Sequence, residues 1–324
     1  MAHFIPAADI DDAPARAARI GVLGFGNQGH AHALNLHEAG LSVSVGLRRS
    51  SDKWPVVEAA GLKAMEYGDC AAASDWVVMA LPDQHMAALY ADIEPRLAPG
   101  STVIFVHGFG LEFGGIRPRA DLDVVLVGPK GSGASLRAEV LAGRGLASLV
   151  AVHQDASGMA QSKALAYAKA IGAAWGESLL TTVREETVTD LFGEQAVLCG
   201  GVPALVRCAY QTLVDAGYSP ELAYFECVHE LKLITDLIYT RGLAGMQAAI
   251  SETAAYGGEI TGDKVIRPEA VRDTLAKIQS GEFARAWLAE AAAGAPTLAA
   301  AKQAAASDPI EAVAASIRAK IILP

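Results

Sequence analysis

Four acidic side chains in the C-terminal half of the chain have the spacing and the setting of a metal site. Asp190 and Glu194 are four residues apart, and so are Glu226 and Glu230. On an α-helix this spacing puts each pair on one face, one turn apart. Their sequence neighbours are mostly apolar or aromatic, and a carboxylate in such surroundings is costly unless it is paired, hydrogen-bonded or bound to a cation.

Oxygen ligands alone favour a hard cation, so these acids predict Mg²⁺ chemistry. Mg²⁺ keeps several waters and shares its coordination shell with substrate oxygens, and four carboxylates balance the charge of two such ions. The same spacing also fits ordinary helix-surface pairs or solvated faces, and the spacing alone leaves that alternative open. A zinc site through His229, Cys208 and Cys227 lacks a recognised ligand spacing.

A second set of residues, near the N-terminus, has the pattern of a dinucleotide loop. The segment Gly24-Phe25-Gly26-Asn27-Gln28-Gly29 fits G-x-G-x-x-G between a predicted strand and a predicted helix. Gly24 permits the tight turn, Gly26 lets the backbone approach a pyrophosphate, and Gly29 allows close helix–strand packing. The helix N-terminus supplies N–H groups and partial positive charge. This context favours a dinucleotide site over a glycine-rich turn without a ligand.

The segment after the second predicted strand indicates which dinucleotide is preferred. An NAD site usually has an acid about 20 residues beyond the glycines, whereas this chain has Arg48-Arg49-Ser50-Ser51-Asp52-Lys53. Two arginines and two serines suit a 2′-phosphate, while Asp52 would repel it. We expect the arginines to outweigh the acid, giving NADPH preference with measurable NADH use. A solvated basic turn is the alternative.

The elements that must position these residues form two unlike halves. Up to about residue 180, β-branched runs alternate with helical stretches, which is typical of a parallel sheet with helical crossovers. Beyond about residue 183, strand signals vanish and long amphipathic stretches follow. We predict an α/β fold with a Rossmann-like dinucleotide-binding domain over residues 1–182 and an all-α domain over residues 183–324. The predicted strands lie at residues 19–23, 42–47, 76–81, 102–106, 124–127 and 147–152.

Composition limits the classes of function. The 324 residues exceed what one hydrophobic core usually supports, so two domains are expected. The 26 basic and 36 acidic residues give a net charge of −10, which argues against general nucleic-acid binding. We expect no membrane association, because no run of roughly 18 apolar residues occurs and the acidic N-terminal segment does not fit a secretory signal. Four cysteines without CxxC spacing favour a reducing, cytoplasmic location.

Taken in order along the chain, these segments resemble the ketol-acid reductoisomerase family. The most specific matches are the acid-bearing segments DLFGEQAVLCGG (190–201) and YFECVHELKLITDLIY (224–239). The matches span nearly the whole chain, and its length fits the family's short form, class I, with one helical region. Further matching segments are GFGNQGHAHALNL (24–36), HGF (107–109), PKGSG (129–133), QDASG (154–158), SETAAYG (251–257) and IQSGEFA (278–284).

The resemblance implies an enzyme that performs two steps at one site. Mg²⁺ chelates an acetohydroxy acid, 2-acetolactate or 2-aceto-2-hydroxybutyrate, and an alkyl group migrates between adjacent carbons. NADPH then reduces the rearranged ketone to the 2,3-dihydroxy acid, in valine and isoleucine biosynthesis. The resemblance also implies two Mg²⁺ ions and a homodimer with shared active sites, and it leaves open a higher oligomer of dimers.

The resemblance assigns roles to the acids residue by residue. Asp190 would bridge the two ions, and Glu194 would complete one of them. Glu226 would bind the second ion, with Glu230 holding its waters or the substrate hydroxyl. Ser251 would contact the substrate carboxylate.

Two further side chains and the remaining cofactor contacts follow from the same resemblance. Lys130 would lie beside the ions and assist proton movement, and His107 would lie near the nicotinamide and the substrate. The chain departs from the family's common residues at Asn27 (serine), Gly128 (alanine) and Ser132 (proline), and none of these changes removes a metal ligand. The remaining implied cofactor contacts are Leu81, Pro82, Asp83 and Gly133.

Two other classes of protein compete with this interpretation. A β-hydroxyacid dehydrogenase-like enzyme also joins a Rossmann domain to a helical one, but it needs no metal, and the four acids would then lack a task. A non-catalytic nucleotide-binding module would leave the acids, Lys130 and Ser251 without a joint function. Activity that survives EDTA would favour the first rival. NADPH oxidation with an acetohydroxy acid would exclude the second.

Overall fold

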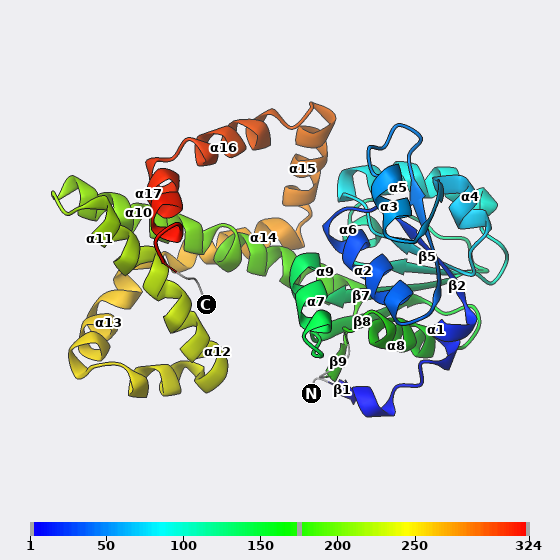
Figure 1. Ribbon diagram of the computed structural model, residues 1–324, viewed down its shortest axis with the longest axis horizontal. Coiled ribbons are helices and arrows are strands. Elements are labelled where there is room, and N and C mark those ends of the chain that lie inside the picture. Colours follow the sequence, from blue (N-terminus) through cyan, green and yellow to red (C-terminus); the bar gives the residue numbers. More distant parts are fainter. Residues whose placement is uncertain (1–2, 174–176, 322–324) are drawn as a thin grey trace. The chain divides into compact units, whose positions relative to one another are not determined.

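The chain is described by a computed structural model over residues 3–173 and 177–321. Contacts within the chain divide it into two units, residues 1–189 and residues 190–324, and each is described by itself (Figure 1). The sequence placed the domain boundary at residue 182, immediately before helix α9 (Val183–Gly193). The contacts assign about the first two turns of α9 to the first unit.

The first unit contains, within the described residues, a nine-stranded sheet of order β1-β9-β8-β7-β6-β5-β2-β3-β4. The six strands from β4 to β7 are mutually parallel. In chain order they follow the usual Rossmann arrangement, 3-2-1-4-5-6. The strands are β1 (His3–Pro6), β2 (Arg19–Leu23), β3 (Ser42–Leu47), β4 (Lys63–Glu66), β5 (Trp76–Met79), β6 (Thr102–Phe105), β7 (Asp123–Pro129), β8 (Ser148–Gln154) and β9 (Glu177–Leu180).

The prediction of a parallel Rossmann-like sheet is confirmed for those six strands and wrong at one edge. There β8 pairs antiparallel with β7, and β1 pairs antiparallel with β9. All six predicted strands exist, with ends displaced by at most a few residues. The strands β1, β4 and β9, each of four residues, carry too little β-branched character to be predicted from the sequence.

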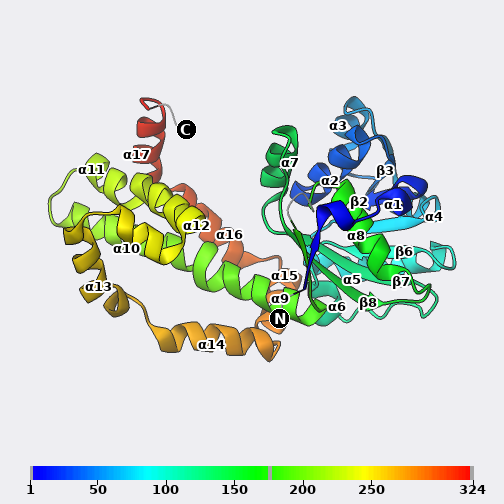
Figure 2. The ribbon, with the colours of Figure 1, turned by 90° about the horizontal axis from the view of Figure 1, so that it is seen from below.

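Helices cover both faces of this sheet, and the core is split accordingly (Figures 1 and 2). Successive strand residues point to opposite faces, so Val22 and Val78 join one cluster while Leu23 and Val77 join the other. Both faces are buried, as expected of a parallel sheet. The helices are α1 (Ala13–Ala17), α2 (Asn27–Glu38), α3 (Trp54–Ala59), α4 (Tyr67–Ala72), α5 (Asp83–Ile93), α6 (Phe109–Glu112), α7 (Gly133–Leu141) and α8 (Ala160–Ala170).

The described elements of the second unit are all helical, which agrees with the predicted all-α region. Two π-helical stretches adjoin the two acid pairs that the sequence singled out: Glu194 begins one of them and Glu226 lies in the other. The sequence did not predict these π-helical turns. The elements after α9 are η3 (Glu194–Leu198, π), α10 (Gly201–Asp215), α11 (Pro220–Tyr224), η4 (Phe225–His229, π), α12 (Glu230–Ala249), α13 (Glu252–Val265), α14 (Pro268–Gln279), α15 (Glu282–Ala292), α16 (Pro296–Ala306) and α17 (Pro309–Arg318).

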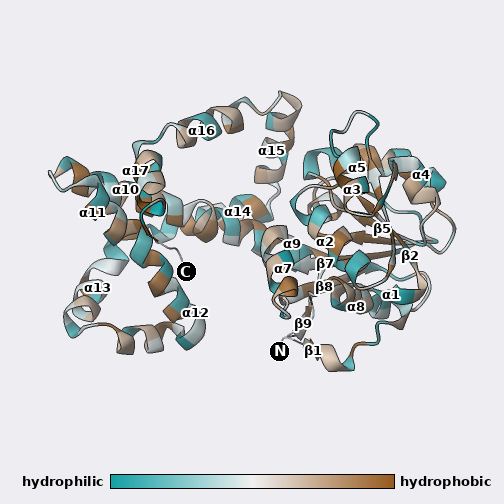
Figure 3. Ribbon diagram, viewed as in Figure 1, coloured by the Kyte–Doolittle hydropathy of each residue, from teal (hydrophilic) through white to brown (hydrophobic). Residues whose placement is uncertain are grey.

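The second unit buries little of its apolar surface in a single chain. A small cluster around Tyr210, Tyr224 and Ile317 joins α10, α11 and α17. In contrast, Tyr239 is 92% exposed and Leu243 is 70% exposed, and apolar segments recur along these helices (Figure 3). Such exposed apolar surface on a folded unit marks an interaction surface.

One helical stretch, residues 183–215, is long and apolar enough to cross a membrane by length and composition alone. Its most apolar window has a mean hydropathy of 1.4 and only 6% of it is buried. The expectation of no such segment rested on uninterrupted apolar runs, and this stretch is interrupted by Asp190 and Glu194. Most of this apolar window is exposed in the single chain, which is unusual for a soluble helix and calls for a partner surface.

A buried histidine links two helices on one face of the first unit. His32 of α2 and Tyr167 of α8 are both fully buried, and His32 Nδ1 lies 2.8 Å from the Tyr167 hydroxyl. Burial lowers the pKa of His32 to about 3, so the imidazole stays neutral in the folded chain.

This burial predicts acid sensitivity. The unfolded chain binds a proton at His32 below about pH 6.5, whereas the folded chain resists protonation until about pH 3. The stabilisation is therefore complete above the unfolded pKa and decreases as the pH falls through this window. Denaturant unfolding at about pH 7.5 and about pH 5 should show a loss on the order of 2 kcal/mol from this group.

The variant His32→Met should remove most of that pH-dependent loss, even if its stability at neutral pH is lower. The matched control is His37→Gln, because His37 lies on the same helix but is exposed. The control should retain the pH dependence of the unmodified protein. Equal pH dependence in His32→Met and the unmodified protein would contradict the assignment.

Candidate active site

The glycine loop between β2 and α2 has the geometry that its sequence predicted. Gly24 has φ 102°, and a Cβ there would lie 2.5 Å from the Ala80 carbonyl oxygen. A Cβ on Gly29 would lie 2.3 Å from the Gly24 carbonyl oxygen. A Cβ on Gly26 would meet no described atom within 4 Å, so this residue faces open space at the N-terminus of α2. An anion can therefore approach the helix N-terminus there.

A cavity of about 460 Å³ opens at this loop, at the carboxyl ends of β2, β3 and β5. Parallel sheets bind dinucleotides at this position, where the strand order reverses. The cavity also includes Lys53, Tyr67 and His85, which were not among the predicted cofactor contacts. The predicted cofactor residues that line it are Gly24, Phe25, Gly26, Arg48, Ser51, Asp52, Leu81 and Pro82.

The remaining predicted cofactor residues lie elsewhere. Ser50 lines neither this cavity nor its neighbours, and Asp83 begins α5 just beyond the cavity wall. Arg49 is turned toward Glu66 of β4, with Nε 2.8 Å and Nη2 2.7 Å from Glu66 Oε1. Arg48 is therefore the arginine of the predicted pair that faces the dinucleotide cavity.

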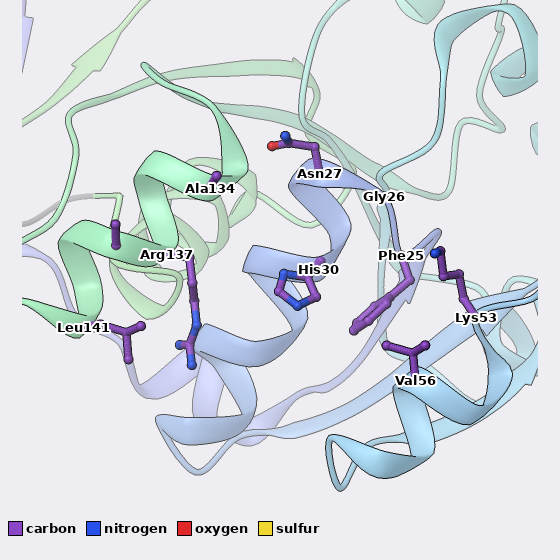
Figure 4. Close-up of a pocket in the computed structure, with 10 residues that line it drawn as sticks. Phe25, Gly26, Asn27, His30, Lys53, Val56, Ala134, Arg137 and Leu141 are labelled. Atoms are coloured by element: carbon purple, nitrogen blue, oxygen red, sulfur yellow. The ribbon is translucent and has the colours of Figure 1, made fainter. Parts of the chain in front are cut away.

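The glycine loop is open on a second side. A cavity of about 620 Å³ flanks it between α2, α3 and α7, and Phe25, Gly26 and Lys53 line both cavities (Figure 4). Asn27 lies on this flank. The backbone of the loop is therefore accessible from two directions.

The segment after β7 packs directly on the glycine loop. Gln28 Nε2 donates to the Gly131 carbonyl oxygen at 3.0 Å, and a Cβ on Gly133 would lie 2.0 Å from the Asn27 carbonyl oxygen. Gly133 thus acts through close packing. Gln28 Oε1 is buried and has no hydrogen-bond partner in the described structure, as expected of a group that a ligand satisfies.

A buried carboxylate at the sheet's carboxyl edge brings two of the predicted catalytic residues together. Glu186 of α9 has a side chain 1% exposed. Its Oε2 lies 3.2 Å from His107 Nδ1 and accepts a hydrogen bond from the Gly108 backbone N–H at 3.1 Å. Its Oε1 lies 3.4 Å from Lys130 Nζ. Glu186 therefore orients both side chains from one point.

Glu186 was not among the predicted site residues, although the sequence carries a signal for it. It precedes Asp190 by four residues, just as Asp190 precedes Glu194. The pattern of acids on one helical face thus begins one turn earlier than predicted. The start of α9 is fixed by Thr182 and Glu185, whose side chains and backbone N–H groups bond reciprocally as a capping box.

Asp190 follows Glu186 by one turn on the continuous helix α9. His107, Glu186 and Asp190 each offer a ligand atom, and these atoms all lie within 4.8 Å of one another. Glu186 is buried, whereas Asp190 is half-buried, so Asp190 is the carboxylate of this group that a hydrated cation can reach more easily. Among the described residues of one chain, the four predicted acids do not form such a group.

The other three acids lie at π-helical turns of the second unit. Glu194 begins η3, Glu226 lies in η4, and Glu230 begins α12; all three are exposed. Such π-bulges in helices occur frequently at functional sites. Ser251 is also exposed, and its hydroxyl accepts from the Ala254 N–H at 3.1 Å as the N-cap of α13. Its observed role is helix capping.

The sheet order and the glycine loop define the class of the protein. It has a Rossmann-type dinucleotide-binding domain and a helical C-terminal domain. Two family models match in succession: "Acetohydroxy acid isomeroreductase, NADPH-binding domain" over residues 15–176, and "Ketol-acid reductoisomerase, C-terminal domain" over residues 183–322. The chain belongs to the ketol-acid reductoisomerase family.

Individual relatives agree with this assignment over nearly their whole length. Two proteins named "Ketol-acid reductoisomerase (NADP(+))" are similar. The one from Psychrobacter sp. is 46% identical, covering 96% of this chain and 93% of the relative. The one from Beutenbergia cavernae is 48% identical, covering 98% and 94%.

A solved structure is similar throughout. The NADH-preferring ketol-acid reductoisomerase from an uncultured archaeon has a TM-score of 0.95 and 38% identity, covering 99% of this chain and 100% of that one. The resemblance stated from the sequence is confirmed, and the dehydrogenase-like alternative is not favoured.

The arrangement around Glu186 predicts a large effect of a small change. Glu186→Gln keeps the shape of the side chain but removes the charge that holds His107 and Lys130. We expect kcat to fall by about ten- to a hundredfold, while the dissociation constant of the dinucleotide changes little. The measurement is steady-state kinetics together with cofactor titration.

The matched control is Glu185→Gln on the adjacent, exposed residue. This change weakens the capping box of α9 without touching His107 or Lys130, so it should lower stability slightly and leave kcat within about twofold. A Glu186→Gln variant with unchanged kcat would show that the carboxylate charge is not needed for turnover.

Proposed function

We propose that the protein converts 2-acetolactate and 2-aceto-2-hydroxybutyrate to the corresponding 2,3-dihydroxy acids, by an Mg²⁺-dependent alkyl migration followed by reduction with NADPH. The observation that carries this proposal is the Glu186 cluster. Glu186 contacts His107 and Lys130, Asp190 lies close to His107 and Glu186, and the segment that contains Lys130 packs on the dinucleotide loop. The Glu186 cluster and the dinucleotide loop lie at the same edge of the sheet. This arrangement suits a metal-dependent step and a hydride transfer on the same substrate.

We propose Asp190, Glu194, Glu226 and Glu230 as the ligands of two Mg²⁺ ions. Carboxylate oxygens are the donors that Mg²⁺ prefers, and the acids adjoin π-helical turns. When bound, such ions supply Lewis-acid polarisation of the substrate hydroxyl and carbonyl oxygens. Ser251 is proposed to contact the substrate carboxylate, in addition to capping α13.

The residues around Glu186 are proposed to handle protons and orientation. Lys130 Nζ is held 3.4 Å from Glu186 Oε1, which fixes an ammonium donor at the sheet edge. From there it can donate a proton to an oxygen of the substrate, or accept one, as negative charge moves during the rearrangement. His107 is oriented by the same carboxylate and is proposed to lie between the nicotinamide and the substrate.

We propose NADPH as the preferred cofactor, with NADH also used. Arg48, Ser51 and Lys53 line the dinucleotide cavity and can contact a 2′-phosphate. Asp52 lies in the same wall and opposes that charge, and its Oδ2 is 3.7 Å from Lys53 Nζ. The opposing charges support a moderate preference.

The direct test is an NADPH-oxidation assay with 2-acetolactate, run with Mg²⁺, without it, and with EDTA. We expect oxidation that requires both the substrate and Mg²⁺. Oxidation that persists in EDTA would contradict the metal assignment and favour a metal-free dehydrogenase. No oxidation under any of these conditions would contradict the proposed reaction.

The metal assignment makes a prediction for one residue. Asp190→Asn removes the charge proposed to bridge the two ions, so both steps should fail and turnover should fall at least about a hundredfold. The control Asp215→Asn changes an exposed acid at the end of α10 and should have near-normal turnover. Near-normal activity in Asp190→Asn would refute the proposed bridging role.

We propose that the protein is a homodimer, located in the cytoplasm, whose second units cover each other. The small core of the second unit and the exposure of Leu198, Tyr239, Leu243 and Tyr256 support this proposal. So does the apolar stretch over residues 183–215, because an obligate interface is rich in apolar surface. Glu226, Glu230 and Ser251 would then reach the partner's active site.

Shared sites can be tested by mixing two inactive variants, Asp190→Asn and Glu226→Gln. In a mixed dimer one site carries both changes and the other carries neither. Random exchange makes about half of the dimers mixed, so about a quarter of the full activity should return. The measurement is turnover after subunit exchange, with mixed dimers verified by differently tagged chains.

The matched control mixes Asp190→Asn with Glu194→Gln. These two acids are proposed to serve the same site from the same chain, so every site in every dimer retains one defect and no activity should return. Verified mixed dimers of Asp190→Asn and Glu226→Gln that remain inactive would refute shared sites.

A further inference from the structure

The loop after β3 offers two adjacent arginines, but they face different surroundings. Arg48 lines the dinucleotide cavity, whereas Arg49 does not line it and instead lines a smaller neighbouring cavity of about 230 Å³. In that neighbouring cavity Arg49 is held by Glu66 through Nε and Nη2, at 2.8 Å and 2.7 Å. Glu66 is the last residue of β4, and it was not singled out by the sequence.

The neighbouring cavity is electrostatically balanced, unlike a phosphate site. The charges of its acids offset those of its arginines. A second ion pair joins Arg96 Nη1 to Asp69 Oδ1 at 3.5 Å. A site for a phosphate dianion needs an excess of cationic donors. Because Arg49 is paired with Glu66 in this balanced cavity, it is not oriented to bind the 2′-phosphate. Its charged residues are Arg48, Arg49, Arg96, Glu66, Asp69 and Asp92.

The two cavities are nevertheless neighbours. Leu47, Arg48 and Tyr67 line both of them, and Tyr67 directly follows Glu66. A guanidinium released from Glu66 would start next to the wall of the dinucleotide cavity. Arg49 is also 85% exposed, so no packing prevents it from changing direction.

We propose that Glu66 is a cofactor-specificity residue: it competes with the 2′-phosphate of NADPH for Arg49 and thereby lowers the preference for NADPH over NADH. The inference rests on the proposed dinucleotide site and deepens it, because it places part of the selectivity on a strand outside the loop. NADH lacks the phosphate, so its binding does not involve this competition.

The expected effect is moderate, because an exposed ion pair is weak. Such pairs contribute little to stability, and the phosphate can compete with Glu66 for the same guanidinium. Removing the charge of Glu66 should therefore tighten NADPH binding by about two- to fivefold. It should leave NADH binding unchanged.

The experiment measures the dissociation constants of NADPH and NADH on the full-length protein without substrate. It also measures 2′,5′-ADP against ADP, which isolates the 2′-phosphate from the nicotinamide. The variants are Glu66→Gln, Arg49→Gln and the double variant. The charge-matched control is Glu58→Gln on α3, an exposed acid that lines none of these cavities.

A specific pattern is expected. Glu66→Gln tightens NADPH and 2′,5′-ADP but not NADH or ADP, while Glu58→Gln changes none of them beyond twofold. Arg49→Gln alone weakens NADPH by less than about twofold, yet it cancels the whole gain in the double variant. Only a coupling between Glu66 and Arg49 produces this combination.

Three outcomes would overturn the inference. The first is an unchanged dissociation constant for NADPH in Glu66→Gln. The second is an equal change in the dissociation constants of NADPH and NADH in that variant. The third is a tenfold loss of NADPH affinity in Arg49→Gln alone. The last would mean that Arg49 already serves the phosphate. Failure of the proposed function is separate: it would appear as an unmodified protein that binds neither cofactor, or binds them and turns over no acetohydroxy acid.

Discussion

A carboxylate buried at the edge of a parallel sheet constrains everything around it. Glu186 is 1% exposed, and a buried charge is tolerated only when donors surround it. Those donors come from two places in the chain: His107 and Gly108 follow β6, and Lys130 follows β7. The first turns of α9, which belong to the first unit, are thereby anchored to the sheet at a point where ligands of a Rossmann domain gather.

Small residues allow this close approach. A Cβ on Gly108 would lie 2.0 Å from Thr187 Oγ1, so α9 could not pack against the loop after β6 with any larger residue there. A Cβ on Gly128 would lie 2.9 Å from Glu186 Oε1. The glycine found where the resemblance suggested alanine therefore gives the Glu186 carboxylate extra room, which connects a sequence departure to the geometry of the cluster.

The sequence predicted what depends on local pattern and missed what depends on distant partners. Buried strands such as β2 and β3 follow from β-branched runs, and the glycine loop follows from backbone requirements at Gly24 and Gly29. In contrast, the orientation of Arg49 is decided by Glu66, on a neighbouring strand. Glu186 was not predicted as a site residue, because its contacts are with His107 and Lys130, which lie far from it in sequence. The π-helical turns have no simple sequence pattern.

The buried Glu186 carboxylate and the exposed loop after β3 differ in how they tolerate substitution, and this difference has an evolutionary consequence. Glu186 is buried and bonded to several partners, so most substitutions of it are expected to be selected against. Arg49 and its neighbours are exposed, and single changes among them alter charge without disturbing packing. A relative with a TM-score of 0.95 is described as NADH-preferring. Lineages can therefore adapt to the cellular supply of reduced nicotinamides while the chemistry stays constant.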